Sequence, residues 1–293
     1  MALRVTHRSL FTSNLANLQT NLSRIQGTQE RLSSGKAISR PSDAPSGTGA
    51  ALLHRSQIGR DQQLLRNADD GLGWLSSADT ALQDINGATG RVRELLISAN
   101  NGSLAPTARE AIALEIEGLR DQLMAVANTE YLGRPIFGGT TSGGQAYDAS
   151  GAFVGDQQPV SRSVRPGVAV QVNVTGPAVF GPPGDDLFGF LTDVADHLRN
   201  DPSQLGADLG KVETHLTSIR NALSVTGARY SQIESMRSKT DNDLLLAKEK
   251  LSEIEDIDLP ATIVDLQLQE TAYQAALSAT ARSVQPSLLD FLR

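Results

Sequence analysis

Side chains able to do chemistry are sparse in this sequence and do not gather at the spacings that catalysis or metal binding needs. The four histidines are His7, His54, His197 and His215, and no two of them are four residues apart as in a helical metal site. We interpret each of them as an exposed or packed histidine. The chain has no cysteine, which excludes disulfides, thiolate nucleophiles and cysteine-ligated zinc.

Two short segments begin like ligand-binding loops but lack the residues such loops need. Residues 47–52, Gly-Thr-Gly-Ala-Ala-Leu, have no third glycine and follow a Pro/Ser/Asp loop instead of an apolar strand, so we predict a helix start there. The acidic residues 253–258 lack the central glycine and spacing of a calcium loop, which favours a solvated helix face and a helix cap at Asp258. We therefore predict no catalytic, cofactor-binding or metal-binding residues, and no enzymatic activity.

Composition restricts the partners further. The 293 residues carry a net charge of −7 and no cluster of lysine and arginine, so we expect no nucleic-acid partner. No apolar run approaches the ~20 residues of a membrane helix, and the first residues lack the pattern of a secretory signal peptide. The chain is 39% hydrophobic and 4% aromatic, which suits long helices packed along narrow stripes better than one thick core. These features alone would indicate a cytoplasmic protein.

Both ends of the chain carry narrow apolar stripes at heptad spacing. A stripe this narrow buries little apolar area per ordered residue, so we predict that neighbouring copies of the chain help to cover it. We also predict that the first and last helices lie side by side, with their stripes facing. The predicted interface residues are Leu15, Leu18, Leu22, Ile25 and Leu32 near the N-terminus, and Leu266, Tyr273, Leu277, Leu288, Leu289 and Phe291 near the C-terminus.

Between the ends, long helical patterns surround a segment of different character. Alternation of Val168, Val170, Val172 and Val174 predicts a strand with these valines on one face. Trp74 lies beside a leucine stripe and is expected in a core. The predicted fold is mainly α: an elongated helical hairpin or coiled-coil bundle with a small β-rich insertion. Its parts are an N-terminal helix and loop (1–45) paired with a C-terminal helix (240–293), a helical bundle (46–132 and 185–239) and a separately removable insertion (133–184).

Several motifs resemble those of one known family. Residues 31–47, Arg-Leu-Ser-Ser-Gly-Lys-Ala-Ile-Ser-Arg-Pro-Ser-Asp-Ala-Pro-Ser-Gly, are similar to the segment after the first helix in the flagellin superfamily. Residues 131–139, 165–176 and 273–277 resemble further elements of it. The loop motif Arg40, Pro41, Ser42 and Asp43 and the ending Leu-Asp-Phe-Leu favour the hook-associated protein 3 branch over the flagellins. Ala44 departs from the family, which often has a second acidic residue there.

The resemblance implies a structural subunit of the bacterial flagellum. Such subunits are handled by an export chaperone and pass unfolded through the type III export channel, so they need no cleavable signal peptide. They form a ring or helical homo-oligomer between hook-associated protein 1 and the flagellin filament. Their terminal helices form an inner tube and the β-rich domain faces outward. The implied location is therefore extracellular, at the hook–filament junction, and not cytoplasmic.

Three alternatives stay open at this point. The chain could be a flagellin that builds the filament itself, although the proline-containing loop and the Leu-Asp-Phe-Leu ending count against this. A cytoplasmic coiled-coil adaptor would share the heptads but not the terminal motifs. An enzyme hidden in the β-rich segment would need a convergent set of polar residues, and the sequence offers none.

Overall fold

The computed structural model describes residues 7–100, 104–142 and 144–284. Two compact units make up the chain: a terminal unit, Met1–Gly59 with Leu244–Arg293, and a central unit, Arg60–Asp243. The helices in chain order are α1 (His7–Ser34), α2 (Pro45–Ala99), α3 (Pro106–Ala127), α4 (Gly176–Phe180), α5 (Leu187–Asn200), α6 (Leu205–Glu255) and α7 (Leu259–Val284). No helix among these described residues has the length and hydropathy to cross a membrane.

The helix ends follow from local chemistry. Helix α1 ends before Gly35, whose φ of +70° is a conformation that glycine adopts without steric cost. Helix α2 begins at Pro45, a residue suited to the first helical position because its missing N–H would have no partner there. The side chain of Asp258 accepts a hydrogen bond from the backbone N of Ala261 at 3.1 Å, which confirms the predicted cap of α7.

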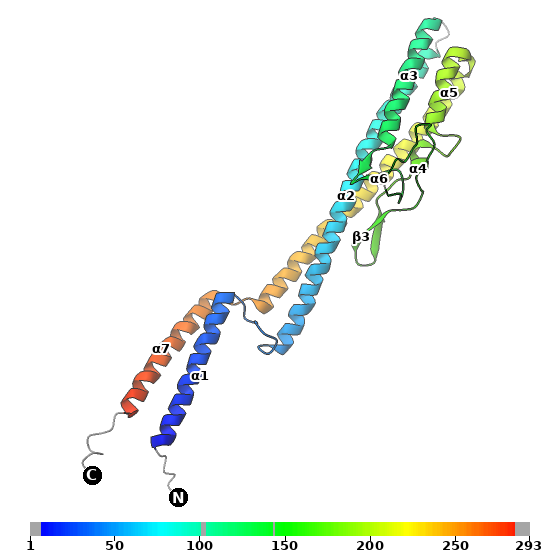
Figure 1. The fold of residues 1–293 in the computed structure, drawn as a ribbon. Helices are drawn as coiled ribbons and strands as arrows, with labels where there is room; N and C mark the ends of the chain where they lie inside the picture. The colour runs from blue at the N-terminus through cyan, green and yellow to red at the C-terminus, as the bar shows by residue number, and fades with distance from the viewer. Residues whose placement is uncertain (1–6, 101–103, 143, 285–293) are drawn as a thin grey trace, which may run out of the picture. The chain divides into compact units, whose positions relative to one another are not determined.

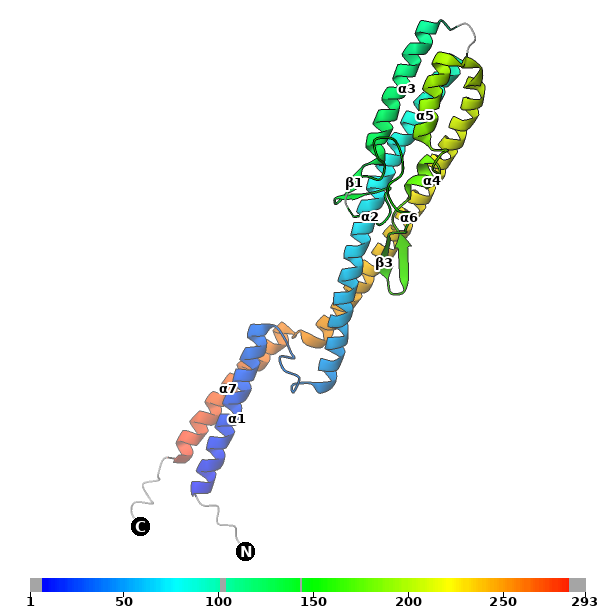
Figure 2. The same cartoon turned by 45° about the vertical axis from the view of Figure 1, so that its right-hand side comes forward.

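The central unit is built around one hydrophobic core. Helices α2, α3, α5 and α6 lie alongside one another and contribute to it (Figures 1 and 2). Trp74 on α2 is 1% exposed and packs edge-on against Tyr131, which confirms its predicted place in a core. Among the core side chains that almost no solvent reaches are Leu82, Leu96, Ile116, Leu123, Leu191, Val212 and Ile219.

The segment between α3 and α5 contains two small antiparallel sheets. Strand β1 (Glu130–Tyr131) pairs with β2 (Arg134–Pro135), and β3 (Ser161–Arg165) pairs with β4 (Val168–Gln171). The predicted strand over residues 168–174 is therefore too long, because β4 ends at Gln171. Just beyond it the backbone N of Val172 still donates a hydrogen bond to the carbonyl oxygen of Val160 at 2.8 Å. The side chain of the buried Asn173 adds a second bond, in which its Oδ1 accepts from the backbone N of Val160 at 2.9 Å.

This β-rich segment shares the core of the helices. The ring of Tyr147 lies 5.1 Å from that of Phe180 and 5.0 Å from that of Phe188, which belongs to α5. Phe137 packs edge-on against Phe180 at 5.5 Å. Removing residues 133–184 would uncover Phe188, so the prediction that the helices fold without this segment does not fit the packing.

The predicted fold class is confirmed. The chain is mainly α, its first and last helices pair, and its strands are confined to the two small sheets among the described residues.

Candidate assembly interface

Helices α1 and α7 lie side by side in both views of the terminal unit, as predicted (Figures 1 and 2). Thr28 Oγ1 donates a hydrogen bond to Gln269 Oε1 at 3.2 Å between them. Buried or partly buried side chains recur at heptad spacing on both helices, and we call this set the terminal seam. It consists of Asn14, Leu18, Asn21, Ile25, Thr28 and Leu32 on α1, and Thr262, Leu266, Gln269, Tyr273, Ala276 and Thr280 on α7.

Half of the terminal seam is polar. On α1, asparagine or threonine alternates with leucine or isoleucine, and α7 alternates in a similar way. Polar side chains at such positions specify register in coiled coils and lower stability, because they replace apolar contacts. The two helices therefore pair with a defined register but with little apolar area buried between them.

The predicted interface residues separate into two groups. Leu18, Ile25, Leu32, Leu266 and Tyr273 lie in the terminal seam. Leu15, Leu22 and Leu277 lie outside the terminal seam, with side chains that are 47%, 42% and 43% exposed, and their place in the assembly interface stays a prediction. A search for apolar spacing selects only hydrophobic residues, so it misses the polar seam residues Asn14 and Asn21 of α1. Leu288, Leu289 and Phe291 lie outside the described residues.

Helix α7 carries further apolar side chains that solvent reaches. Val264 and Leu268, four residues apart on one face, are more than half exposed, as are Leu245 and Leu246 near the end of α6. They were not among the predicted interface residues because a single heptad stripe omits them, although the i, i+4 spacing of the α7 pair is visible in the sequence. The terminal unit thus presents leucine and valine to solvent on more than one helix face.

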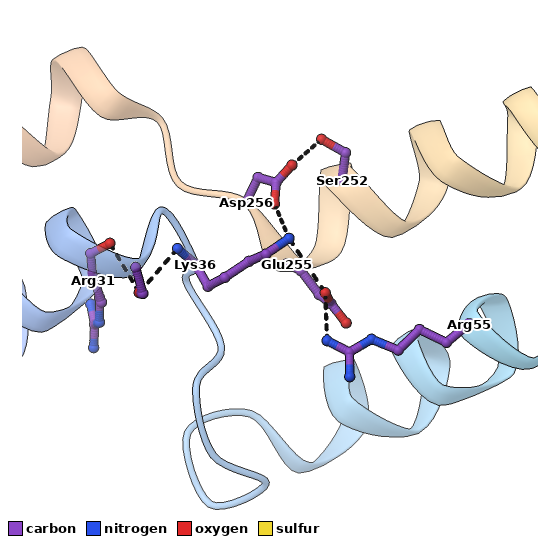
Figure 3. Close-up of polar contacts among 7 residues, drawn as sticks. Arg31, Lys36, Arg55, Ser252, Glu255 and Asp256 are labelled. Atoms are coloured by element: carbon purple, nitrogen blue, oxygen red, sulfur yellow. Dashed lines mark hydrogen bonds and ion pairs between the residues drawn. The ribbon is translucent and has the colours of Figure 1, made fainter. Parts of the chain in front are cut away.

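A cluster of charged residues joins the loop after α1 to the end of α6. Figure 3 shows these four residues, Lys36, Arg55, Glu255 and Asp256, which we call the clasp. Lys36 Nζ lies 2.6 Å from Asp256 Oδ1 and 3.6 Å from Glu255 Oε2. Arg55, from the first turns of α2, reaches the same Glu255 oxygen at 2.9 Å. Two cations and two carboxylates from three segments therefore meet at one point of the terminal unit.

Backbone hydrogen bonds reinforce the clasp. The backbone N of Ala37 donates to the carbonyl oxygen of Glu255 at 2.6 Å, and the backbone N of Ile257 donates to that of Gly35 at 3.1 Å. The hydrogen bond from Lys36 is the main reason that the pKa of Asp256 lies below its usual value, and Asp256 in turn raises the pKa of Lys36.

Glu255 corrects one sequence prediction. The acidic residues 253–258 were expected to form a solvated face, but Glu255 is only 3% exposed. Its burial depends on Lys36 and Arg55, which lie 219 and 200 residues earlier in the sequence (255 − 36 and 255 − 55). No local pattern could have indicated this.

Two family descriptions match most of the chain. The bacterial flagellin N-terminal helical region matches residues 5–142, and the bacterial flagellin C-terminal helical region matches residues 209–292. The chain belongs to the flagellin superfamily. Within the described residues, both helices of the terminal seam and all four clasp residues lie inside the two matched regions.

Relatives within the superfamily extend over nearly the whole chain. Flagellar hook-associated protein 3 of Escherichia coli is 27% identical, over 94% of this chain and 96% of its own length. A flagellin of Bacillus subtilis is 26% identical, over 99% of this chain and 100% of its own length. The crystal structure of flagellar hook-associated protein 3 from Legionella pneumophila has a similar fold, with a TM-score of 0.63 at 17% identity over 69% of this chain and 98% of that one.

The loop motif of this superfamily member builds its own turn. Asp43 Oδ2 accepts hydrogen bonds from the backbone N of Ser39 at 3.1 Å and of Arg40 at 2.8 Å. The backbone N of Asp43 donates to the carbonyl oxygen of Arg40 at 3.0 Å, which places Pro41 at the second position of a four-residue turn. The hydrogen bond from the Arg40 N–H is the main cause that lowers the pKa of Asp43. The motif therefore shapes the loop that carries Lys36 and Ala37 to the clasp.

The flagellin-like chain holds one acid–histidine pair that sequence spacing did not reveal. His197 Nδ1 lies 2.8 Å from Asp208 Oδ2, because the turn between α5 and α6 brings the two helices together. Within the described part of the chain, no three His, Cys, Asp or Glu side chains are grouped so that they could hold a metal ion.

Proposed function

We propose that this chain is a structural subunit of the bacterial flagellum that joins the hook to the flagellin filament. The observation that carries the proposal is the pairing of flagellin-type terminal helices through a half-polar seam that leaves apolar side chains in solvent. Such a pair gains most of its stabilisation only when further copies cover the exposed leucines. The similarity to hook-associated protein 3 over nearly the whole chain supports the junction in preference to another place in the flagellum.

In this proposal copies of the chain form a ring or helical homo-oligomer through their terminal units. Leu15, Leu22 and Leu277 are the contact residues, and each gains about 1 kcal/mol when its remaining exposed area is covered, since full burial of a leucine is worth about 1.5–3 kcal/mol. The clasp keeps the loop after α1 and the end of α6 together. Each copy therefore enters the oligomer with the loop after α1 and the end of α6 in the same arrangement.

The other partners follow from position in the flagellum. Hook-associated protein 1 lies on the hook side, flagellin lies on the filament side, and an export chaperone holds the chain before type III export. The mature location is extracellular. The chain reaches it through the type III export channel, and its proposed role there is structural.

A second candidate function is that of a filament flagellin. The 26% identity to the Bacillus subtilis flagellin over 99% of this chain favours it. The two functions differ in copy number, since a filament contains thousands of subunits and a junction about one ring.

The deciding experiment locates the chain in purified flagella from the source organism. Antibody against the chain should label the distal end of isolated hook–basal bodies, also in cells that lack the filament. Deletion of the gene should release unpolymerised flagellin into the medium and abolish motility. Label along the filament would instead identify a flagellin. If neither the hook nor the filament were labelled, a flagellar role would be overturned.

A further inference from the structure

A cleft of about 320 Å³ opens on the central unit between α6 and the segment that follows β4. Val225 of α6 forms part of its apolar lining. The polar lining of the cleft comes from Ser218, Asn221 and Arg229 of α6 and from Gln171, Asn173 and Thr175. Two of the lining residues, Val174 and Ala222, belong to the hydrophobic core of the central unit.

Arg229 is a half-buried cation whose hydrogen-bond partners are neutral. Its Nη1 donates to the carbonyl oxygen of Asn173 at 2.8 Å, and its Nη2 donates to Gln171 Oε1 at 3.1 Å. No carboxylate among the described residues forms an ion pair with it. By contrast Arg162 pairs with Asp70 at 2.5 Å, and Arg165 pairs with Asp243 at 2.9 Å, in the same unit.

The guanidinium of Arg229 has N–H donors that its hydrogen bonds within the chain do not use. A guanidinium has five N–H donors, and the two hydrogen bonds above account for two of them. Burial removes water from this charge, and it lowers the pKa of Arg229 without a paired acid to offset the effect. A carboxylate is the group that matches a guanidinium in both charge and planar geometry, and it can accept two parallel N–H bonds.

We propose that this cleft receives a carboxylate side chain from a second copy of this chain. The inference rests on the proposed function, because flagellar assembly is what brings copies together. Charge complementarity favours this occupant: the chain carries a net charge of −7, and exposed acids such as Asp84 and Asp193 have no hydrogen bond or ion pair to the described residues of their own copy. Thr175 and Asn221 supply a hydroxyl and an amide that bind the same carboxylate beside Arg229.

Three variants of the full chain test the inference in cells that lack the native gene. Arg229→Gln removes the charge from the cleft. Val225→Glu keeps Arg229 but places a carboxylate of the same chain four residues before it on α6, a spacing at which Glu and Arg pair well. Arg220→Gln is the matched control, because it removes one exposed arginine from the same helix outside the cleft.

The measurement is the number of copies retained on purified hook–basal bodies after washing at low and high salt. We expect Arg229→Gln and Val225→Glu each to reduce retention roughly tenfold, and Arg220→Gln to match the wild type. The melting temperature of purified Val225→Glu should not fall, because its new pair is internal to the chain. A role of Arg229 confined to holding Asn173 and Gln171 predicts instead that Val225→Glu assembles normally, and that result would overturn the inference.

Two further outcomes are distinguishable. If the wild type and Arg220→Gln are themselves absent from the flagellum, the proposed function has failed, and with it the inference. A second experiment distinguishes a free carboxylate from a carboxylate of a second copy. The purified chain is titrated with acetate, and the Nε–H resonance of Arg229 is followed by NMR. Saturation at low millimolar acetate together with normal assembly of Val225→Glu would assign the cleft to a free carboxylate and not to a second copy.

Discussion

The central and terminal units use the same heptad spacing for different purposes. In the central unit the heptad positions of α6, such as Val212 and Ile219, are fully buried against a core that also contains Trp74. In the terminal unit the shielded positions alternate between apolar and polar, and leucines beside them stay in solvent. A heptad pattern therefore indicates that helices pair, but the residues between its apolar positions decide whether the pair is stable without further partners.

The two units should differ most in the unfolding free energy that is lost when an aromatic residue is replaced by alanine. Trp74→Ala should lower the free energy of unfolding by about 3–5 kcal/mol, because it opens a cavity in a closed core. Tyr273→Ala, in the partly buried terminal seam, should cost less than about 1.5 kcal/mol, since only part of the ring loses packing. Urea unfolding followed by circular dichroism measures both. Equal losses for the two variants would show that the terminal unit has a core of comparable quality.

The clasp is the part of the terminal unit where single changes should matter most. Glu255→Gln should destabilise the joint by about 1–2 kcal/mol, since the buried group loses its charge opposite two cations. Amide hydrogen exchange at Ala37 and Ile257 should become faster, because both N–H groups bond across the joint. Glu253→Gln is the control: it removes an exposed acid of the same turn, paired with Lys250, and should leave both amides unchanged.

The same joint should respond to pH in a defined direction. The folded pKa of Asp256 lies below its usual value of 3.8, so its pairing stabilises the fold above about that pH and is lost as the pH falls through the folded pKa. Lys36 has a raised pKa, so its contribution is present below its usual 10.5 and is lost at higher pH. An NMR titration of the Asp256 carboxyl should give a midpoint below 3.8, and Lys36→Gln should move it upward. If the midpoint were unchanged in Lys36→Gln, the hydrogen bond from Lys36 would not be the cause of the lowered pKa of Asp256.

The smallest effect on stability should come from the exposed leucines of α1. Leu22→Asp should change the free energy of unfolding of the purified chain by no more than about 0.5 kcal/mol, since its side chain already meets solvent. Incorporation into the flagellum and motility should nevertheless fall sharply, because the new carboxylate would be buried between copies. Leu114→Asp, an equally polar change at an exposed leucine of α3, should leave both properties unaltered. Normal motility of Leu22→Asp would exclude this face as a contact between copies.

Much of this protein could be predicted from local sequence. Glycine at position 35 and aspartate at 258 mark helix ends through backbone freedom and a side-chain cap, and both act within a few residues. The predicted start of α2 at residues 47–52 is slightly late, because the helix begins at Pro45, which suits the first helical position. Apolar spacing of three and four predicted the long helices and the pairing of the first with the last. The loop and terminal motifs by themselves indicate the flagellin superfamily.

Tertiary structure decided which of these side chains are shielded. Leu22 and Leu18 look alike in the sequence, but the pairing of α1 with α7 covers only Leu18. Glu255 is buried by Lys36 and Arg55 from the other end of the chain, and Arg229 has neutral partners because the segment after β4 folds onto α6. Such environments depend on contacts between residues tens to hundreds of positions apart, and short-range spacing carries no information about them.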